Sequence, residues 1–171
     1  MTEIDATGTE TLDGVELKAG FGTSPVEVLR TMSGLDYMRG ICEGRFPAAT
    51  IARALGFRMA QVEEGKVMFT GVPTEAHMNP IGTVHGGWAA TILDSALACS
   101  VHTLAPIGYA STSVELKVNF VRPILPTTGR LYCHGSVIHP GRQLATSEAR
   151  LTDENGKLFA HGTQTCSIFK L

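Results

Sequence analysis

The chain has 171 residues, of which 43% are hydrophobic and 18% are charged, and its formal net charge is −2. These values are typical of one folded domain of ordinary size, and they exclude a disordered chain. The small negative charge and the lack of any Lys/Arg cluster argue against a nucleic-acid partner.

The cysteines and the termini bear on the compartment. The four cysteines are widely spaced without a C-x-x-C pair, which predicts reduced thiols. The opening MTEIDATGTE is acidic and polar, unlike a secretory or mitochondrial signal. The most apolar segment is shorter than the roughly 20 residues needed to span a bilayer. We expect a soluble cytoplasmic protein with no membrane partner.

The first 56 residues are predicted to form an arm and a helical extension. Residues 1–20 lack periodicity and predict a flexible or loosely docked arm. Within residues 21–56, Ser24-Pro25 predicts a helix start, with Ser24 as cap, Glu27 completing a capping box and Gly34 as the end. Further short helices are expected at about 35–43 and 50–55.

Residues 57–171 carry a different pattern, which predicts the main domain. Period-two alternation over residues 57–74, with a turn at 64–66, predicts a β-hairpin. A long helix follows, and then a meander of about four strands near residues 110–122, 130–138, 143–152 and 157–169. One antiparallel sheet wrapped around one long central helix satisfies both patterns, which is the α+β hotdog fold with extra N-terminal helices.

The long helix carries one charged residue, Asp94, within WAATILDSALACSV. A helix that is apolar on every side is expected to be buried by its neighbours. A buried carboxylate without a partner is costly, so such a group is a candidate for chemistry. A structural acid paired with a distant Arg is the alternative.

Two glycines open this helix, Gly86 and Gly87. Their amides lie among the helix-start donors that lack intrahelical partners, where the helix dipole is positive. They can therefore hold a carbonyl oxygen that gains negative charge. Asp94 follows Gly86 by eight residues, about 12 Å along the axis, which is too far for one bond-breaking event within one helix. Two chains packed side by side would close this gap.

A longer motif connects these residues. The run Asn79-Pro-Ile-Gly-Thr-Val-His85-Gly86-Gly87, followed by Asp94 and by a strand beginning at Thr112, resembles the hotdog acyl-CoA thioesterases of the phenylacetate-degradation (PaaI-like) type. It also resembles the 4-hydroxybenzoyl-CoA thioesterases that carry a helix carboxylate. The resemblance covers roughly residues 57–169.

The resemblance implies a role for each motif residue. Gly86 is expected to donate its N–H to the thioester carbonyl, and Asn79 to hold that carbonyl or the attacking water. Asp94 of the other subunit is expected to be the general base or the nucleophile. His85 is expected to shape the loop or contact the thioester, and Thr112 to assist the water. Residues expected to contact substrate are Gly87, Trp88, Ser113 and Arg142, the last through a CoA phosphate.

A purely structural role is the alternative for several of these residues. Asn79 before Pro80 also suits a turn, Thr112 suits a strand, and Arg142 in its turn suits solvent. Trp88 stands where the family often has a smaller residue, so it either narrows the acyl pocket or packs. The histidines show no metal-ligand spacing, and no G-x-S-x-G motif is present.

The sequence therefore predicts an acyl-CoA thioesterase that cleaves an aryl or medium-chain fatty acyl thioester to free acid and CoA. No cofactor is expected, because CoA is part of the substrate. The resemblance implies a homodimer with shared sites and a tetramer of two dimers. The alternatives are a non-catalytic acyl-CoA sensor on the same fold and a hotdog dehydratase or hydratase.

Overall fold

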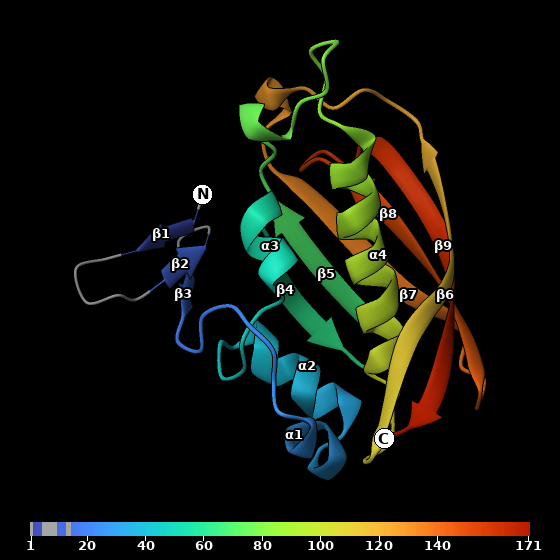
Figure 1. Cartoon of the computed structure of the whole chain (residues 1–171). Coiled ribbons are helices and arrows are strands. Elements are labelled where there is room, and N and C mark those ends of the chain that lie inside the picture. The colour runs from blue at the N-terminus through green and yellow to red at the C-terminus, as the bar shows by residue number, and fades with distance from the viewer. Residues whose placement is uncertain (1, 5–9, 13–14) are drawn as a thin grey trace.

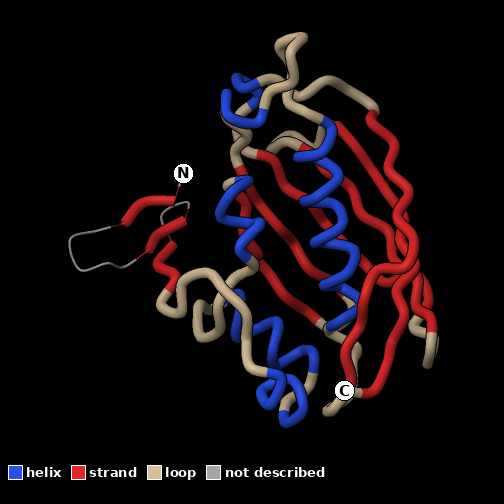
Figure 2. Tube along the Cα trace, in the orientation of Figure 1, coloured by secondary structure: helices blue, strands red, loops and turns tan. Residues whose placement is uncertain are grey.

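The computed structural model describes residues 2–4, 10–12 and 15–171. A six-stranded antiparallel sheet curves around one long helix, α4 (Gly86–His102), and three short helices lie to one side (Figure 1). Figure 2 shows the same arrangement by element type, with α4 crossing the concave side of the strands. This is the expected α+β architecture. Across the described ranges, no helix is long and apolar enough to cross a membrane.

The sheet order is β4-β5-β7-β8-β9-β6. As expected, β4 (Phe57–Glu63) and β5 (Lys66–Gly71) form a hairpin, and β7 (Leu131–His139), β8 (Leu144–Thr152) and β9 (Leu158–Lys170) form a meander. The place of β6 (Tyr109–Phe120) differs from the expected four-strand meander. Because β5 occupies the side of β7 away from β8, β6 pairs with β9 at the far edge.

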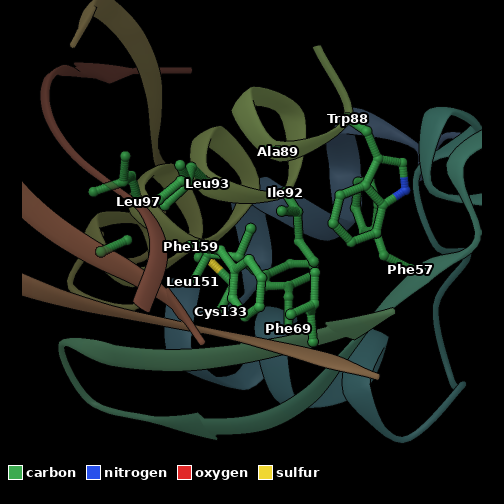
Figure 3. Close-up of a cluster of buried hydrophobic side chains, with 14 of the residues drawn as sticks. Phe57, Phe69, Trp88, Ala89, Ile92, Leu93, Leu97, Cys133, Leu151 and Phe159 are labelled. Carbon is green, nitrogen blue, oxygen red and sulfur yellow. The ribbon is translucent and has the colours of Figure 1, made fainter. Parts of the chain in front are cut away.

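Close contact between α4 and the sheet depends on a glycine in β7. A Cβ on Gly135 would lie 2.3 Å from the carbonyl oxygen of Ala96 in α4, so only glycine allows this approach. Large side chains fill the remaining space between helix and sheet (Figure 3). The cluster includes Trp88, Ile92, Leu93 and Leu97 from the helix and Phe57, Phe69, Cys133, Leu151 and Phe159 from the strands.

The three N-terminal helices are α1 (Val26–Thr31), α2 (Gly34–Cys42) and α3 (Thr50–Leu55), close to their expected positions. Two details differ. Ser24 does not cap α1, and its hydroxyl instead accepts a hydrogen bond from the hydroxyl of Tyr37. Gly34 opens α2 and does not end α1, whose last residue is Thr31. A Cβ on Gly34 would lie 1.8 Å from the carbonyl oxygen of His102, so glycine allows α2 to approach α4 closely. Helix α2 thereby packs directly against the end of α4.

The start of the chain contains regular structure where the sequence predicted an arm without it. Strands β1 (Thr2–Ile4), β2 (Glu10–Leu12) and β3 (Val15–Leu17) pair into a small antiparallel sheet. An ion pair of 2.7 Å between Glu10 and Arg53 ties this sheet to α3. The rest of the expected arm, residues 1, 5–9 and 13–14, lies outside the described residues.

We predict that Gly135→Ala lowers the free energy of unfolding by about 1–3 kcal/mol, since the new methyl group must push α4 away from β7. The neighbouring Ser136→Ala is the control, because Ser136 is only half-buried and lies on the opposite face of the strand. It should change stability by less than about 0.5 kcal/mol. Urea denaturation of both variants measures the difference, and equal stabilities would contradict this account of the packing.

Candidate active site

The loop before α4 is shaped by Asn79. Its side-chain oxygen accepts a hydrogen bond from the amide of Ile81 (3.0 Å), and its side-chain nitrogen donates to the hydroxyl of Thr83 (2.8 Å). These bonds are the turn chemistry that the sequence left open for Asn79. The residue also lines a cavity beside the start of α4, so the loop role and a position near a ligand are compatible.

The start of α4 distinguishes the two glycines. Nδ1 of His85 accepts a hydrogen bond of 2.8 Å from the amide of Gly87, so His85 caps the helix and occupies that amide. Gly86 is the first helical residue, and its amide therefore has no intrahelical partner. A Cβ on Gly86 would meet the ring of Phe120 at 3.0 Å, so a larger residue would crowd this position. The amide of Gly86 is the donor that a ligand can use.

A cavity of about 450 Å³ adjoins this amide. Its wall is largely apolar, with polar atoms from Asn79, His85 and Arg122. Arg122 is held in place by donating to the carbonyl oxygen of Leu158. The apolar side chains that line it come from α4 and the loop before it, from the end of β6 and the loop after it, and from the start of β9, namely Val84, Ala89, Phe120, Val121, Pro123, Ile124, Phe159 and Ala160.

Asp94 lies midway along α4 and is half-buried within one chain. Its Oδ1 accepts a hydrogen bond of 3.1 Å from the hydroxyl of Ser113 in β6. Nε2 of Gln164 in β9 donates to the same oxygen. Sequence reasoning missed Gln164, although a long polar side chain at an inward-facing strand position was a usable signal. The structure thus pairs the carboxylate with two neutral donors and not with a distant Arg.

Ser113, rather than Thr112, faces Asp94. Residues directly opposite on paired strands share a face of the sheet. Ser113 pairs with the buried Cys166, whereas Thr112 pairs with Ser167 on the outer face. A bulge between Ser113 and Glu115 reverses the alternation, so strict period-two reading from the later part of β6 selects the wrong neighbour. The geometry therefore offers Ser113 for the role that the resemblance implied for Thr112.

The remaining two expected contacts lie elsewhere in this chain. Trp88 is 2% exposed, and its Nε1 donates to the carbonyl oxygen of Leu55 in α3 (2.8 Å), so it packs in the core and does not line the cavity. Arg142 is exposed in the turn between β7 and β8. That turn lies at the C-terminal end of α4, because Ala145 and Val101 share one small core cluster. Within one chain it is far from Gly86.

One side of α4 is not covered by its own sheet. Thr91, Asp94, Ser95 and Ala98 are all only half-buried and share this side of the helix. It runs beside β6, whose outer edge has no paired strand among the described residues. Val114 is 55% exposed there, and Phe120 is 59% exposed. The candidate site is therefore accessible on the side of α4 that carries the Asp94 carboxylate.

Comparison with known proteins places this geometry in context. Residues 81–160 match the model of the thioesterase superfamily. Human acyl-coenzyme A thioesterase 13 is 29% identical over 134 residues, which cover 75% of this chain and 91% of that protein. The residues that match the superfamily model include all of α4 with Asp94, strands β6, β7 and β8, and the start of β9.

Solved structures of other proteins have a similar fold. A phenylacetic acid degradation-related protein from Ralstonia eutropha superposes with a TM-score of 0.70 and 28% identity, covering 77% of this chain and 98% of that one. The PaaI protein of Escherichia coli has a TM-score of 0.67 and 20% identity, covering 80% of this chain and 96% of that one, a likeness of fold. Together with the motif at the start of α4, these findings show a hotdog-fold chain that is similar to PaaI-like thioesterases of the thioesterase superfamily.

Proposed function

We propose that this protein hydrolyses acyl-CoA thioesters to a free acid and CoA. The observation that carries the proposal is the pairing, on one helix, of an amide without an intrahelical partner at Gly86 and a carboxylate at Asp94 held by two donors. The similarity to acyl-coenzyme A thioesterase 13 supports CoA as the thiol part of the substrate.

The reaction needs no group beyond these residues and water. The thioester oxygen accepts a hydrogen bond from the amide of Gly86, which stabilises the negative charge that develops there. In one route, Asp94 takes a proton from water as the water oxygen bonds to the carbonyl carbon. The C–S bond then breaks, and the sulfur leaves as thiolate and gains a proton. In the other route, Asp94 attacks the carbon directly, the C–S bond breaks and the CoA thiolate leaves. Water then hydrolyses the resulting anhydride to the free acid, which restores the Asp94 carboxylate, and a proton from the water passes to the thiolate.

A dimer is part of the proposal, because the two groups are about 12 Å apart along one helix. The unpaired edge of β6 and its exposed apolar side chains favour a second copy of the chain at this position. Across a twofold axis, Gly86 of one chain approaches Asp94 of the other. We extend the proposal to a tetramer of two dimers, as the resemblance implies.

The cavity beside Gly86 supports an apolar acyl group. Two aromatic rings, Phe120 and Phe159, contribute to its wall, and a thioester held by the Gly86 amide would place its acyl part against them. This favours aryl or medium-chain fatty acyl groups as the substrate class. The four free thiols fit a reducing compartment such as the cytoplasm.

The rival functions make different use of the site. A sensor that only binds acyl-CoA has no need of a carboxylate held by two donors, and a dehydratase requires a histidine positioned for proton transfer. In this chain, His85 has a structural use, because its Nδ1 caps α4 by accepting from the amide of Gly87. Hydrolysis is therefore the function that the geometry favours.

We predict that Asp94→Asn lowers kcat by at least about 100-fold while the protein still folds. Release of CoA thiol from benzoyl-, phenylacetyl-, hexanoyl- and palmitoyl-CoA, followed with a thiol-reactive dye, measures this and identifies the preferred acyl group. Thr112→Ala is the matched control for Ser113→Ala, since the two lie side by side on opposite faces of β6. Only the second should reduce kcat. Wild-type turnover by Asp94→Asn would refute the mechanism, and binding without turnover by the wild type would favour the sensor.

A second prediction tests the shared site. Gly86→Ala places a methyl group against Phe120 and beside the carbonyl-binding amide, so it should be nearly inactive. Refolding it in a 1:1 mixture with Asp94→Asn should restore about a quarter of wild-type activity. Half of the dimers then carry both variants, and each of these has one intact site of two. Each variant refolded alone is the control, and a mixture no more active than their mean would show that each site belongs to one chain.

A further inference from the structure

Gln164 is the one long polar side chain fully enclosed between α4 and the sheet in the described part of the chain. It lies on β9 and is 1% exposed. Enclosing an amide without partners is costly, so its two polar atoms need hydrogen bonds. Nε2 donates to Oδ1 of Asp94, and Oε1 accepts from the thiol of Cys166 at 3.3 Å.

The thiol fixes which way round the amide lies. Burial, and secondly the charge of Asp94, raise the pKa of Cys166 to about 11, so the thiol stays protonated at neutral pH. An S–H group that donates requires an acceptor, which on Gln164 is the oxygen. The nitrogen must then face Asp94, whose carboxylate can only accept. Both ends of the side chain thus favour the same orientation.

The two donors on Asp94 act on one oxygen. Ser113 and Gln164 both donate to Oδ1, from the neighbouring strands β6 and β9. Among the hydrogen bonds of the described residues, Oδ2 receives none. Two directional bonds on one oxygen fix the plane of the carboxylate and so fix where the other oxygen points. A hydrogen bond to a charged carboxylate is stronger than a hydrogen bond between two neutral groups.

We propose that Gln164 is a positioning residue that holds Oδ1 of Asp94, so that Oδ2 is the oxygen that meets water or the thioester carbon. The inference rests on the proposed function and deepens it, because it names the reacting oxygen and a group behind it. It applies equally whether Asp94 is a base or a nucleophile. Gln164 itself does not touch the substrate.

The first experiment separates kcat from KM. Gln164→Met keeps similar volume and an apolar fit but cannot donate. It should lower kcat by about 10- to 100-fold with KM within about twofold, as expected for loss of a bond to a charged group. Ser147→Ala is the matched control. Ser147 faces Gln164 across β8 and β9, is fully buried and bonds the carbonyl oxygen of Leu97 instead of Asp94. It should leave kcat unchanged.

The second experiment shows whether Gln164 acts through Asp94. In the Asp94→Ala background, Gln164→Met should have no further effect on the residual kcat, because the oxygen that accepts from Gln164 is already removed. An equal fall in both backgrounds, or wild-type kcat in Gln164→Met alone, would overturn the proposal.

Should Gln164→Met fail to fold, Cys166→Ala and Cys166→Ser take its place. The serine keeps a donor to Oε1 and should stay within about twofold of wild type, while the alanine should lower kcat several-fold.

A final measurement does not depend on turnover. The side-chain amide signals of Gln164, assigned in ¹⁵N-labelled protein by their loss in Gln164→Met, should shift strongly in Asp94→Ala and little in Ser147→Ala. Unmoved signals in Asp94→Ala would refute the contact. If the wild type hydrolyses none of the acyl-CoA panel, the proposed function fails, and these signals still decide the contact separately.

Discussion

The close approach of α4 to its sheet is the constraint on which the site depends. Gly135 allows the backbone of β7 to reach the carbonyl of Ala96, and the apolar side chains of the helix fill the remaining space. At this separation, side chains from β6 and β9 can reach a carboxylate on the helix. A looser helix would leave Asp94 to water and Gln164 without a charged partner. Packing and chemistry are therefore set by the same contact.

Helix α4 carries the two candidate groups at different places, one at its start and one in its middle. Its start is free of side chains at Gly86 and Gly87, and the cap by His85 uses up one of the two amides. Its middle carries a charge that an otherwise apolar helix tolerates because the charge faces the uncovered side. The proposed dimer would bring the two groups together, and β6 has an edge, without a paired strand among the described residues, on which a second chain could pair.

Much of this could be predicted from the sequence because the signals are local. Alternation located the strands, and the two glycines located the helix start. The pairing order was not predictable, since which strand lies beside β9 depends on contacts far apart in the chain. The resemblance pointed to Thr112, and the hydrogen bond from the neighbouring Ser113 to Asp94 was not predictable, because it depends on a bulge that changes which side chains of β6 face the helix. Gln164 was missed because only its hydrogen bond to Asp94, which lies 70 residues away in the chain, marks it as part of the site.

The placement of Ser113 on the edge strand has a consequence for control. This hydroxyl lies on β6, whose outer edge has no paired strand among the described residues. Gln164 lies on β9, which is paired on both sides. The hydrogen bond from Ser113 to Asp94 therefore starts at the edge of the sheet, and that from Gln164 starts in its interior. A molecule that pairs along β6 would lie next to the first of these bonds and not next to the second. In the proposed dimer, association of the chain would therefore change the surroundings of Asp94 through Ser113, without any contact to the substrate.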